Sequence, residues 1–231
     1  MIFTVIRTIM AGGRIDVLSV AAQVLAIVFV ILCVLPLHEL AHGWVAGKLG
    51  DPTARLERRL TLNPLASVDP VGTVWLFLFG FGWAKPVPVN PRYFKKPKRD
   101  MAIVAAAGPI SNVLAALVGA IPATAMMLFA PYNGVTSFIF TLLNYYVTVN
   151  VTLAVFNLLP VPPLDGSRIL GAFLSDRALE MYYRYQNIFV MVMFVLMFSG
   201  AFSGPLYVIE NWLTRGIFFV TSLPFKLFGA A

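Results

Sequence analysis

Three long stretches of this sequence carry no Asp, Glu, Lys or Arg, and they constrain the fold more than any other feature. They cover residues 17–37, 101–164 and 185–209. A helix needs about 20 apolar residues to cross the hydrocarbon core of a bilayer, and each stretch reaches that length. The chain is 59% hydrophobic and only 12% charged, which is untypical of a soluble domain. The sequence therefore predicts an integral, multi-pass membrane protein of the all-α class.

The first two stretches predict the three helices of the core. Residues 17–37 form one span that continues as helix through the 40s, with a kink at Pro36 because proline removes a backbone donor. Residues 101–164 are too many for one crossing and contain the turn-forming run Pro131-Tyr132-Asn133-Gly134. They are therefore expected to form two spans joined by a tight turn.

The C-terminal part predicts one or two further spans. The first is expected at 185–203, and the segment 206–220 is either a fifth span or an interfacial helix. We expect one membrane-embedded domain over residues 1–231, with a core at about 17–170 and additional helices at about 185–225.

The distribution of positive charge predicts the orientation. Ten of the seventeen Lys and Arg residues lie between Lys48 and Arg99, whereas the turn near Asn133 has no charge. Cytoplasmic loops carry an excess of Lys and Arg, so the 48–99 loop is expected in the cytoplasm, although Arg7 and Arg14 then fall on the opposite side. The net charge of +7 is thus explained by membrane topology, and no nucleic-acid partner is expected.

Within this loop, residues 70–91 are largely apolar but too short to cross a bilayer. They are predicted to form a re-entrant or interfacial, β-like segment, with Trp75 and Trp83 as interfacial anchors. The alternation of Val and Pro from Lys85 to Val89 suits an extended edge segment and not a helix interior.

The end of the first span carries an H-E-x-x-H motif, His38-Glu39-Leu40-Ala41-His42. Spacing of i and i+4 places both imidazoles on one helix face, where they can bind one zinc ion. In this motif Glu39 is the general base that takes a proton from water. The motif is short enough to occur by chance, but both histidines of the chain lie in it. Ionisable groups at the end of a membrane span also indicate a function.

A catalytic zinc ion needs a third protein ligand, and no histidine remains to provide it. Asp165 is the best candidate, because it ends the uncharged stretch 101–164 after three closely spaced prolines. The first and third spans run toward the same side, so their ends place Asp165 at the depth of the histidines. The competing carboxylates lie among basic residues, where a solvated carboxylate is the default; they are Asp51, Glu57, Asp69 and Asp100.

These motifs together resemble those of the site-2 protease family of intramembrane zinc metalloproteases, in a compact form without a PDZ or CBS domain. His38-Glu39-x-x-His42 is similar to the zinc helix of that family, and residues 157–166 are similar to its Asn-to-Asp-Gly element. Gly108-Pro109-x-x-Asn112 resembles a small-residue motif of its middle core span. The resemblance covers residues 17–170. It implies a three-helix catalytic core, Asp165 as the third ligand and cleavage of membrane-anchored substrates.

The resemblance also implies that residues 82–89 face the substrate, which makes Pro86, Val87 and Val89 candidate substrate-binding residues. The amide of Asn157 could steady the substrate strand or an oxyanion, or it could make an interhelical hydrogen bond. Asn112 is expected to serve helix packing, together with the small residues before it.

The leading hypothesis is a membrane enzyme with one Zn²⁺ that hydrolyses peptide bonds of membrane-spanning proteins, with Glu39 activating water. The alternative is a non-hydrolytic metal-binding membrane protein or transporter that uses the same ligands. Glu39 distinguishes the two, because a site that only binds metal has no need of a non-ligand carboxylate beside its first histidine. The sequence leaves the oligomeric state and the identity of the substrate open.

Overall fold

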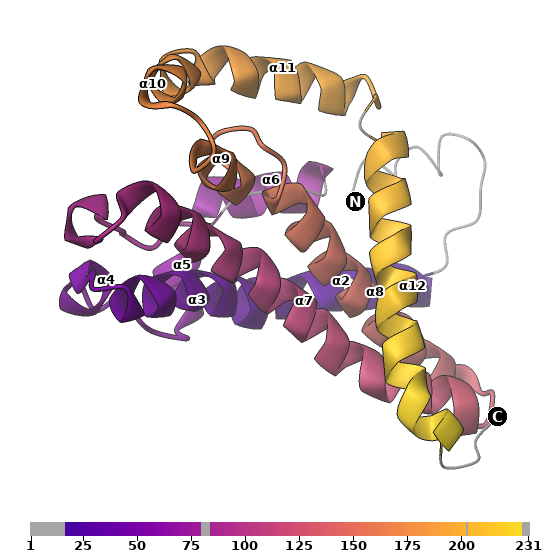
Figure 1. Ribbon diagram of the computed structural model, residues 1–231. Helices are drawn as coiled ribbons and strands as arrows, with labels where there is room; N and C mark the ends of the chain where they lie inside the picture. The colour runs from indigo at the N-terminus through magenta and orange to yellow at the C-terminus, as the bar shows by residue number, and fades with distance from the viewer. Residues whose placement is uncertain (1–16, 80–83, 202, 228–231) are drawn as a thin grey trace.

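The computed structural model describes residues 17–79, 84–201 and 203–227 (Figure 1). The protein is 79% helical and has no strand in this part of the chain, which confirms the all-α class. The elements are α2 (Val17–Phe29), the π-helix η1 (Val30–Val34), α3 (Leu35–Lys48), α4 (Thr53–Leu56), α5 (Pro64–Ser67), α6 (Pro70–Phe79), the 3₁₀-helix η2 (Pro91–Tyr93), α7 (Pro97–Phe129), α8 (Gly134–Asn157), α9 (Asp165–Gly171), α10 (Asp176–Arg184), α11 (Gln186–Phe198) and α12 (Ser203–Leu227).

Three helical rods of the described chain are long and apolar enough to cross a membrane. They are Val20–Lys48, which joins α2, η1 and α3, then Pro97–Phe129 (α7) and Gly134–Asn157 (α8). The predicted turn lies between α7 and α8, where the side chain of Asn133 accepts hydrogen bonds from the first backbone N–H groups of α8. The predicted three-helix core is confirmed.

The predicted kink at Pro36 takes the form of a widened turn directly before it. The N–H of Leu35 donates to the carbonyl of Val30, five residues back, because Pro36 has no N–H with which to continue the regular pattern. The rod then continues as α3 to Lys48. Gly50, with φ of +108°, turns the chain away from the helix end.

Helix α7 is the centre of the packing and contacts α3, α8, α9 and α12 (Figure 1). Small side chains on α7 let its neighbours approach closely. The resulting core joins Ala116 and Ala120 of α7, Val147, Val151 and Val155 of α8, and Ile217 of α12. A hydrogen bond of 2.9 Å between the hydroxyls of Thr124 and Thr221 also holds α12 against α7.

The C-terminal helices differ from the predicted spans. α11 has 13 residues and is therefore about 20 Å long, which is less than the roughly 30 Å of a hydrocarbon core. α12 has 25 residues but carries Glu210, Arg215 and Lys226, and it is not among the helices that are apolar enough to cross. Within the described chain, three rods therefore have the length and composition of a membrane span.

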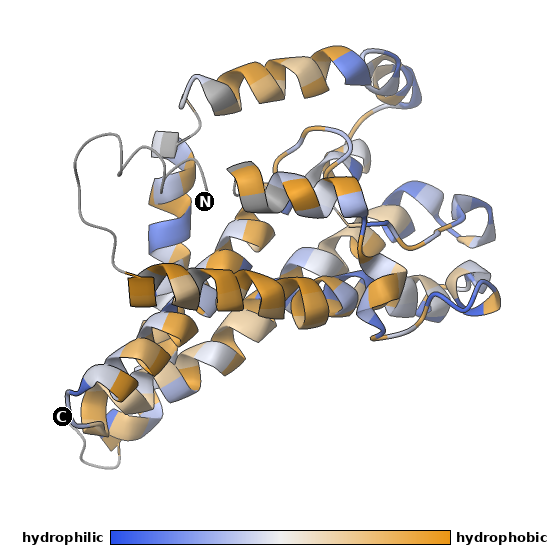
Figure 2. Ribbon diagram, turned by 180° about the vertical axis from the view of Figure 1, so that it is seen from behind, coloured by the Kyte–Doolittle hydropathy of each residue, from blue (hydrophilic) through white to orange (hydrophobic). Residues whose placement is uncertain are grey.

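Polar residues gather at one end of the molecule, around α4, the start of α7 and α10, whereas the rods are largely apolar (Figure 2). The loop between α3 and α7 lies at this end. Residues 70–79 form helix α6 and not the predicted β-like segment, because Asp69 caps a helix that starts with Pro70 and its carboxylate accepts from the N–H of Gly72 at 2.8 Å. A single antiparallel bridge joins Val68 and Ala84. Gly82 and Trp83 lie outside the described residues.

Candidate metal centre

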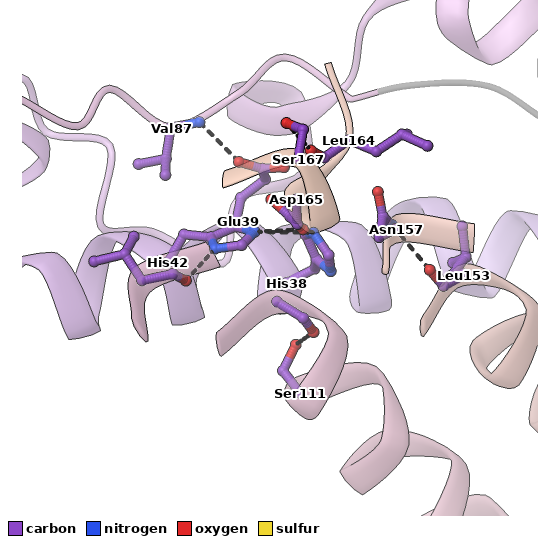
Figure 3. A network of polar contacts seen from close by, with 12 residues as sticks. His38, Glu39, His42, Val87, Ser111, Leu153, Asn157, Leu164, Asp165 and Ser167 are labelled. Atoms are coloured by element: carbon purple, nitrogen blue, oxygen red, sulfur yellow. Dashed lines mark hydrogen bonds and ion pairs between the residues drawn. The ribbon is translucent and has the colours of Figure 1, made fainter. Parts of the chain in front are cut away.

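Helix α3 presents His38 and His42 on one face, one turn apart, as the motif predicts. Their Nε2 atoms lie 3.0 Å apart. Asp165 Oδ2 lies 3.3 Å from His38 Nε2 and 3.2 Å from His42 Nε2. Figure 3 shows the three side chains pointing toward one another. In the described chain this is the one group of three such residues that could hold a metal ion, and all three are buried.

A hydrogen bond to the backbone of α7 fixes the tautomer of His42. Its Nδ1–H donates to the carbonyl of Val104 at 2.7 Å, so in the neutral ring Nε2 carries a lone pair. This lone pair faces Asp165 Oδ2, a buried atom without a hydrogen-bond partner in the described chain. Two acceptors at this distance require a cation or a proton between them, which is the arrangement that a metal site provides.

The spacing of the three atoms fits tetrahedral zinc. Nitrogen and oxygen ligands with bonds of about 2.0–2.1 Å lie about 3.3 Å apart in a tetrahedral site, and the separations here are 3.0, 3.2 and 3.3 Å. Burial acts to raise the pKa of Asp165, but hydrogen bonds and charge from His38 and His42, when these rings carry a proton toward the carboxylate, outweigh it and lower the pKa below its ordinary value. A bound metal cation would take the place of that proton and would favour the ionised carboxylate in the same way.

Two glycines shape the site. At Gly108 of α7 a Cβ atom would lie 2.3 Å from His42 Nε2 and 2.6 Å from His38 Nε2. Gly108 thus leaves free the space that the two candidate ligand nitrogens face. At Gly166, next to Asp165, a Cβ would lie 2.2 Å from the carbonyl oxygen of Leu158, so only glycine lets the start of α9 approach the end of α8.

Glu39 is placed beside the three converging atoms and is not one of them. Its Oε2 accepts a hydrogen bond from the N–H of Val87 at 2.7 Å (Figure 3), and its side chain is buried. The sequence predicts a substrate-facing role for Val87 but not this contact, which spans 48 positions and leaves no local signal. Gly108 is predicted from the sequence to serve packing alone.

The remaining candidates occupy other positions. The amide nitrogen of Asn157 donates to the carbonyl of Leu153 in its own helix at 3.0 Å. Asn112 is buried, and its amide atoms have no partner in the described chain. Asp51 and Asp100 are each 1% exposed, so the prediction that they are solvated is wrong. The carboxylate of Asp51 accepts hydrogen bonds from the backbone N–H groups of Thr53 and Asn90, and that of Asp100 accepts one from the N–H of Lys96.

Comparison with known proteins agrees with this geometry. Residues 124–200, which include Asn157 and Asp165, match the model of peptidase family M50. Over these residues the chain is similar to that family, the site-2 proteases. The resemblance predicted from the sequence is thereby confirmed.

The relatives to which the chain is similar carry names of one kind. "Putative zinc metalloprotease YwhC" of Bacillus subtilis is 46% identical over 58% of the chain and 62% of the relative. "Putative zinc metalloprotease Rip2" of Mycobacterium tuberculosis is 28% identical over 86% of the chain and 78% of the relative. "Zinc metalloprotease MJ0392" of Methanocaldococcus jannaschii is 28% identical over 66% of the chain and 35% of the relative. The chain spans less than two thirds of YwhC and MJ0392. No solved structure matches the chain.

Proposed function

We propose that this protein is an intramembrane metalloendopeptidase that holds one Zn²⁺ with His38, His42 and Asp165 and hydrolyses peptide bonds of membrane-anchored proteins within or near the bilayer. The observation that carries the proposal is the convergence of the two Nε2 atoms and Asp165 Oδ2 within 3.3 Å of one another. A bound zinc ion would act there as a Lewis acid and would lower the pKa of a coordinated water.

The role of Glu39 is that of general base. It takes the proton of the attacking water and passes it to the leaving amine, as the carboxylate of this motif does. The position of Glu39 supports this role, because its Oε2 is engaged by Val87 and its side chain lies on the same helix as the two histidines. The chain around the site excludes bulk water, since His38, Glu39, His42 and Asp165 are each at most 9% exposed.

The substrate is proposed to bind as an unwound strand along residues 84–90, because a helical substrate hides its peptide bonds. Pro86 and Pro88 have no N–H, and the N–H groups of Lys85, Val87 and Asn90 are bonded within the protein. Val89 is left as the one N–H donor of residues 85–90 without a hydrogen bond to the described chain. A substrate strand is therefore expected to pair through Val89 and through backbone carbonyls. Asn157 is retained as a candidate contact.

We further propose that the polar end with the candidate metal centre faces the cytoplasm, on the charge argument for the 48–99 loop. The alternative function is a metal-binding membrane protein or transporter without hydrolysis. Glu39 favours the enzyme, because a buried carboxylate that lies outside the ligand set has no role in simple binding.

The test is to reconstitute the purified protein in liposomes with a panel of membrane-span peptides. We expect cleavage that stops when a chelator removes the zinc and returns when zinc is restored. Stoichiometric zinc without cleavage of any peptide in the panel would favour the binding protein.

A further inference from the structure

The extended residues 84–90, called the edge segment below, are fixed at both ends. At the start, the N–H of Lys85 donates to the carbonyl of Ser67 at 2.7 Å. At the end, the N–H of Asn90 donates to Asp51 Oδ2 at 2.7 Å, and Asp51 is itself 1% exposed. A segment that is bonded at both ends holds the groups between them in place.

Its carbonyl groups are held as well. The Nη2 of Arg59 donates to the carbonyl of Lys85 at 3.0 Å and to that of Pro86 at 3.2 Å. The edge segment is therefore fixed in the protein, although it pairs with no full strand of the described chain.

Val87 is the point at which this fixed element meets helix α3. Its N–H donates to Glu39 Oε2 at 2.7 Å, and its side chain is 7% exposed. One turn beyond Glu39, a Cβ at Gly43 would lie 2.6 Å from Leu60 Cδ2 and 3.1 Å from Val87 Cγ2. The bare surface at Gly43 thus gives room to both side chains, and Val87 packs against α3 beside its hydrogen bond to Glu39.

We infer that the backbone amide of Val87 is a positioning donor for Glu39. The amide binds Oε2 and so leaves Oε1 to take the proton of the attacking water. This inference rests on the function proposed above. A glutamate side chain has three rotatable bonds, and a general base must be held within about 0.5 Å of its productive position. A hydrogen bond from an amide to a buried carboxylate is charge-assisted and short, and it restricts those rotations.

The competing interpretation is that the bond only satisfies a buried N–H and helps to fold the loop. The two interpretations differ in how a loss at Val87 combines with a loss at Glu39. If the Val87 hydrogen bond positions Glu39, removing it has little effect on the rate once the Glu39 carboxylate is gone. If the bond only helps to fold the loop, the rate losses at Val87 and Glu39 are independent and multiply.

The experiment is a double-mutant cycle with Val87→Pro, which removes the N–H and extends the Pro-Val-Pro run, in the wild type and in Glu39→Gln. Lys85→Pro is the matched control, because it removes a neighbouring N–H of the edge segment that bonds Ser67 and not Glu39. We expect Val87→Pro to lower kcat about ten- to a hundredfold in the wild type, with zinc content unchanged. In the Glu39→Gln background, Val87→Pro should lower the residual kcat by less than about threefold. Lys85→Pro should lower kcat by the same factor in the wild type and in Glu39→Gln.

If Val87→Pro does not fold or loses zinc, the α-hydroxy acid analogue of valine at position 87 removes the same N–H by replacing the amide with an ester. An unchanged kcat in a folded variant, or an equal loss in both backgrounds, overturns the positioning role. Those outcomes leave the proposed function intact, because that function fails only if the wild type does not cleave or if Glu39→Gln cleaves as well as the wild type.

Discussion

Gly108 of α7 and His42 of α3 lie closer together than any side chain at position 108 would allow, since a Cβ there would stand 2.3 Å from His42 Nε2. The helix contact and the metal site therefore depend on the same glycine. Small residues at helix contacts in membranes are ordinarily explained by packing. Here the missing side chain also keeps open the space in front of the two candidate ligand nitrogens.

The first prediction is that Gly108→Ala loses zinc, because the added methyl group occupies the space between the imidazoles. We expect zinc affinity to fall at least about tenfold, comparable to the loss of an outer-shell partner. Gly119→Ala is the control, since its Cβ would meet the Tyr146 ring at 2.4 Å, far from the site. It should lower the thermal midpoint and keep the zinc. Equal zinc content in both variants, measured by metal analysis, would show that Gly108 serves packing alone.

A second prediction concerns the ligand set. His38→Ala, His42→Ala and Asp165→Ala should each lower zinc content, since a three-ligand site that loses one ligand binds the metal weakly. Asp100→Ala is the comparison, because Asp100 is buried but bonds the backbone of Lys96. It should keep its zinc. Full zinc occupancy in Asp165→Ala would remove Asp165 from the set.

The third prediction is that two carboxylates of the loop between α3 and α7 contribute differently to stability. Asp51 is 1% exposed and accepts from Thr53 and Asn90, whereas Glu57 is exposed. Asp51→Ala should cost about 1–3 kcal/mol of the free energy of unfolding, because it leaves buried N–H groups unpaired. Glu57→Ala should change it by less than about 0.5 kcal/mol. Thermal unfolding in one detergent measures both, and similar midpoints would contradict the anchoring role of Asp51.

A fourth prediction tests the packing of α12. In a Cys33→Ser background, Thr124→Cys combined with Thr221→Cys should form a disulfide on mild oxidation, because the two hydroxyls lie 2.9 Å apart. Thr124→Cys with Ser222→Cys is the matched pair, since Ser222 lies one position further along α12 and is partly exposed, whereas Thr221 is buried. Crosslinking of the second pair but not of the first would show that α12 is rotated about its axis relative to α7.

Much of this architecture could be predicted because its causes are local. The i, i+4 spacing of His38 and His42 is a property of one helix, and the length of each uncharged stretch can be compared directly with the thickness of the bilayer. Asp165 could be predicted from the topology, because the first and third spans run in the same direction and end on the same side of the membrane. The helix over residues 70–79 could have been recognised from its start, because Asp69 followed by Pro70 is an N-cap signal.

Other parts of the site depend on contacts between distant residues. Nothing near Val87 indicates that its amide bonds Glu39, and nothing near Asp51 indicates that the N–H of Asn90 bonds its carboxylate. Gly108 looks like any small residue of a membrane helix until α3 is placed against it. These relationships exist only once the loop between α3 and α7 has folded back along the rods.

The most direct test of the central claim is Glu39→Gln in the reconstituted cleavage assay, with zinc measured on the same sample. The amide has the size of the carboxylate and can still accept the Val87 hydrogen bond, but it cannot take a proton from water at neutral pH. We predict one zinc per chain and a loss of cleavage of at least about a hundredfold. Cleavage near the wild-type rate, or release of the zinc by this substitution, would contradict the assignment of Glu39 as the base of a zinc peptidase.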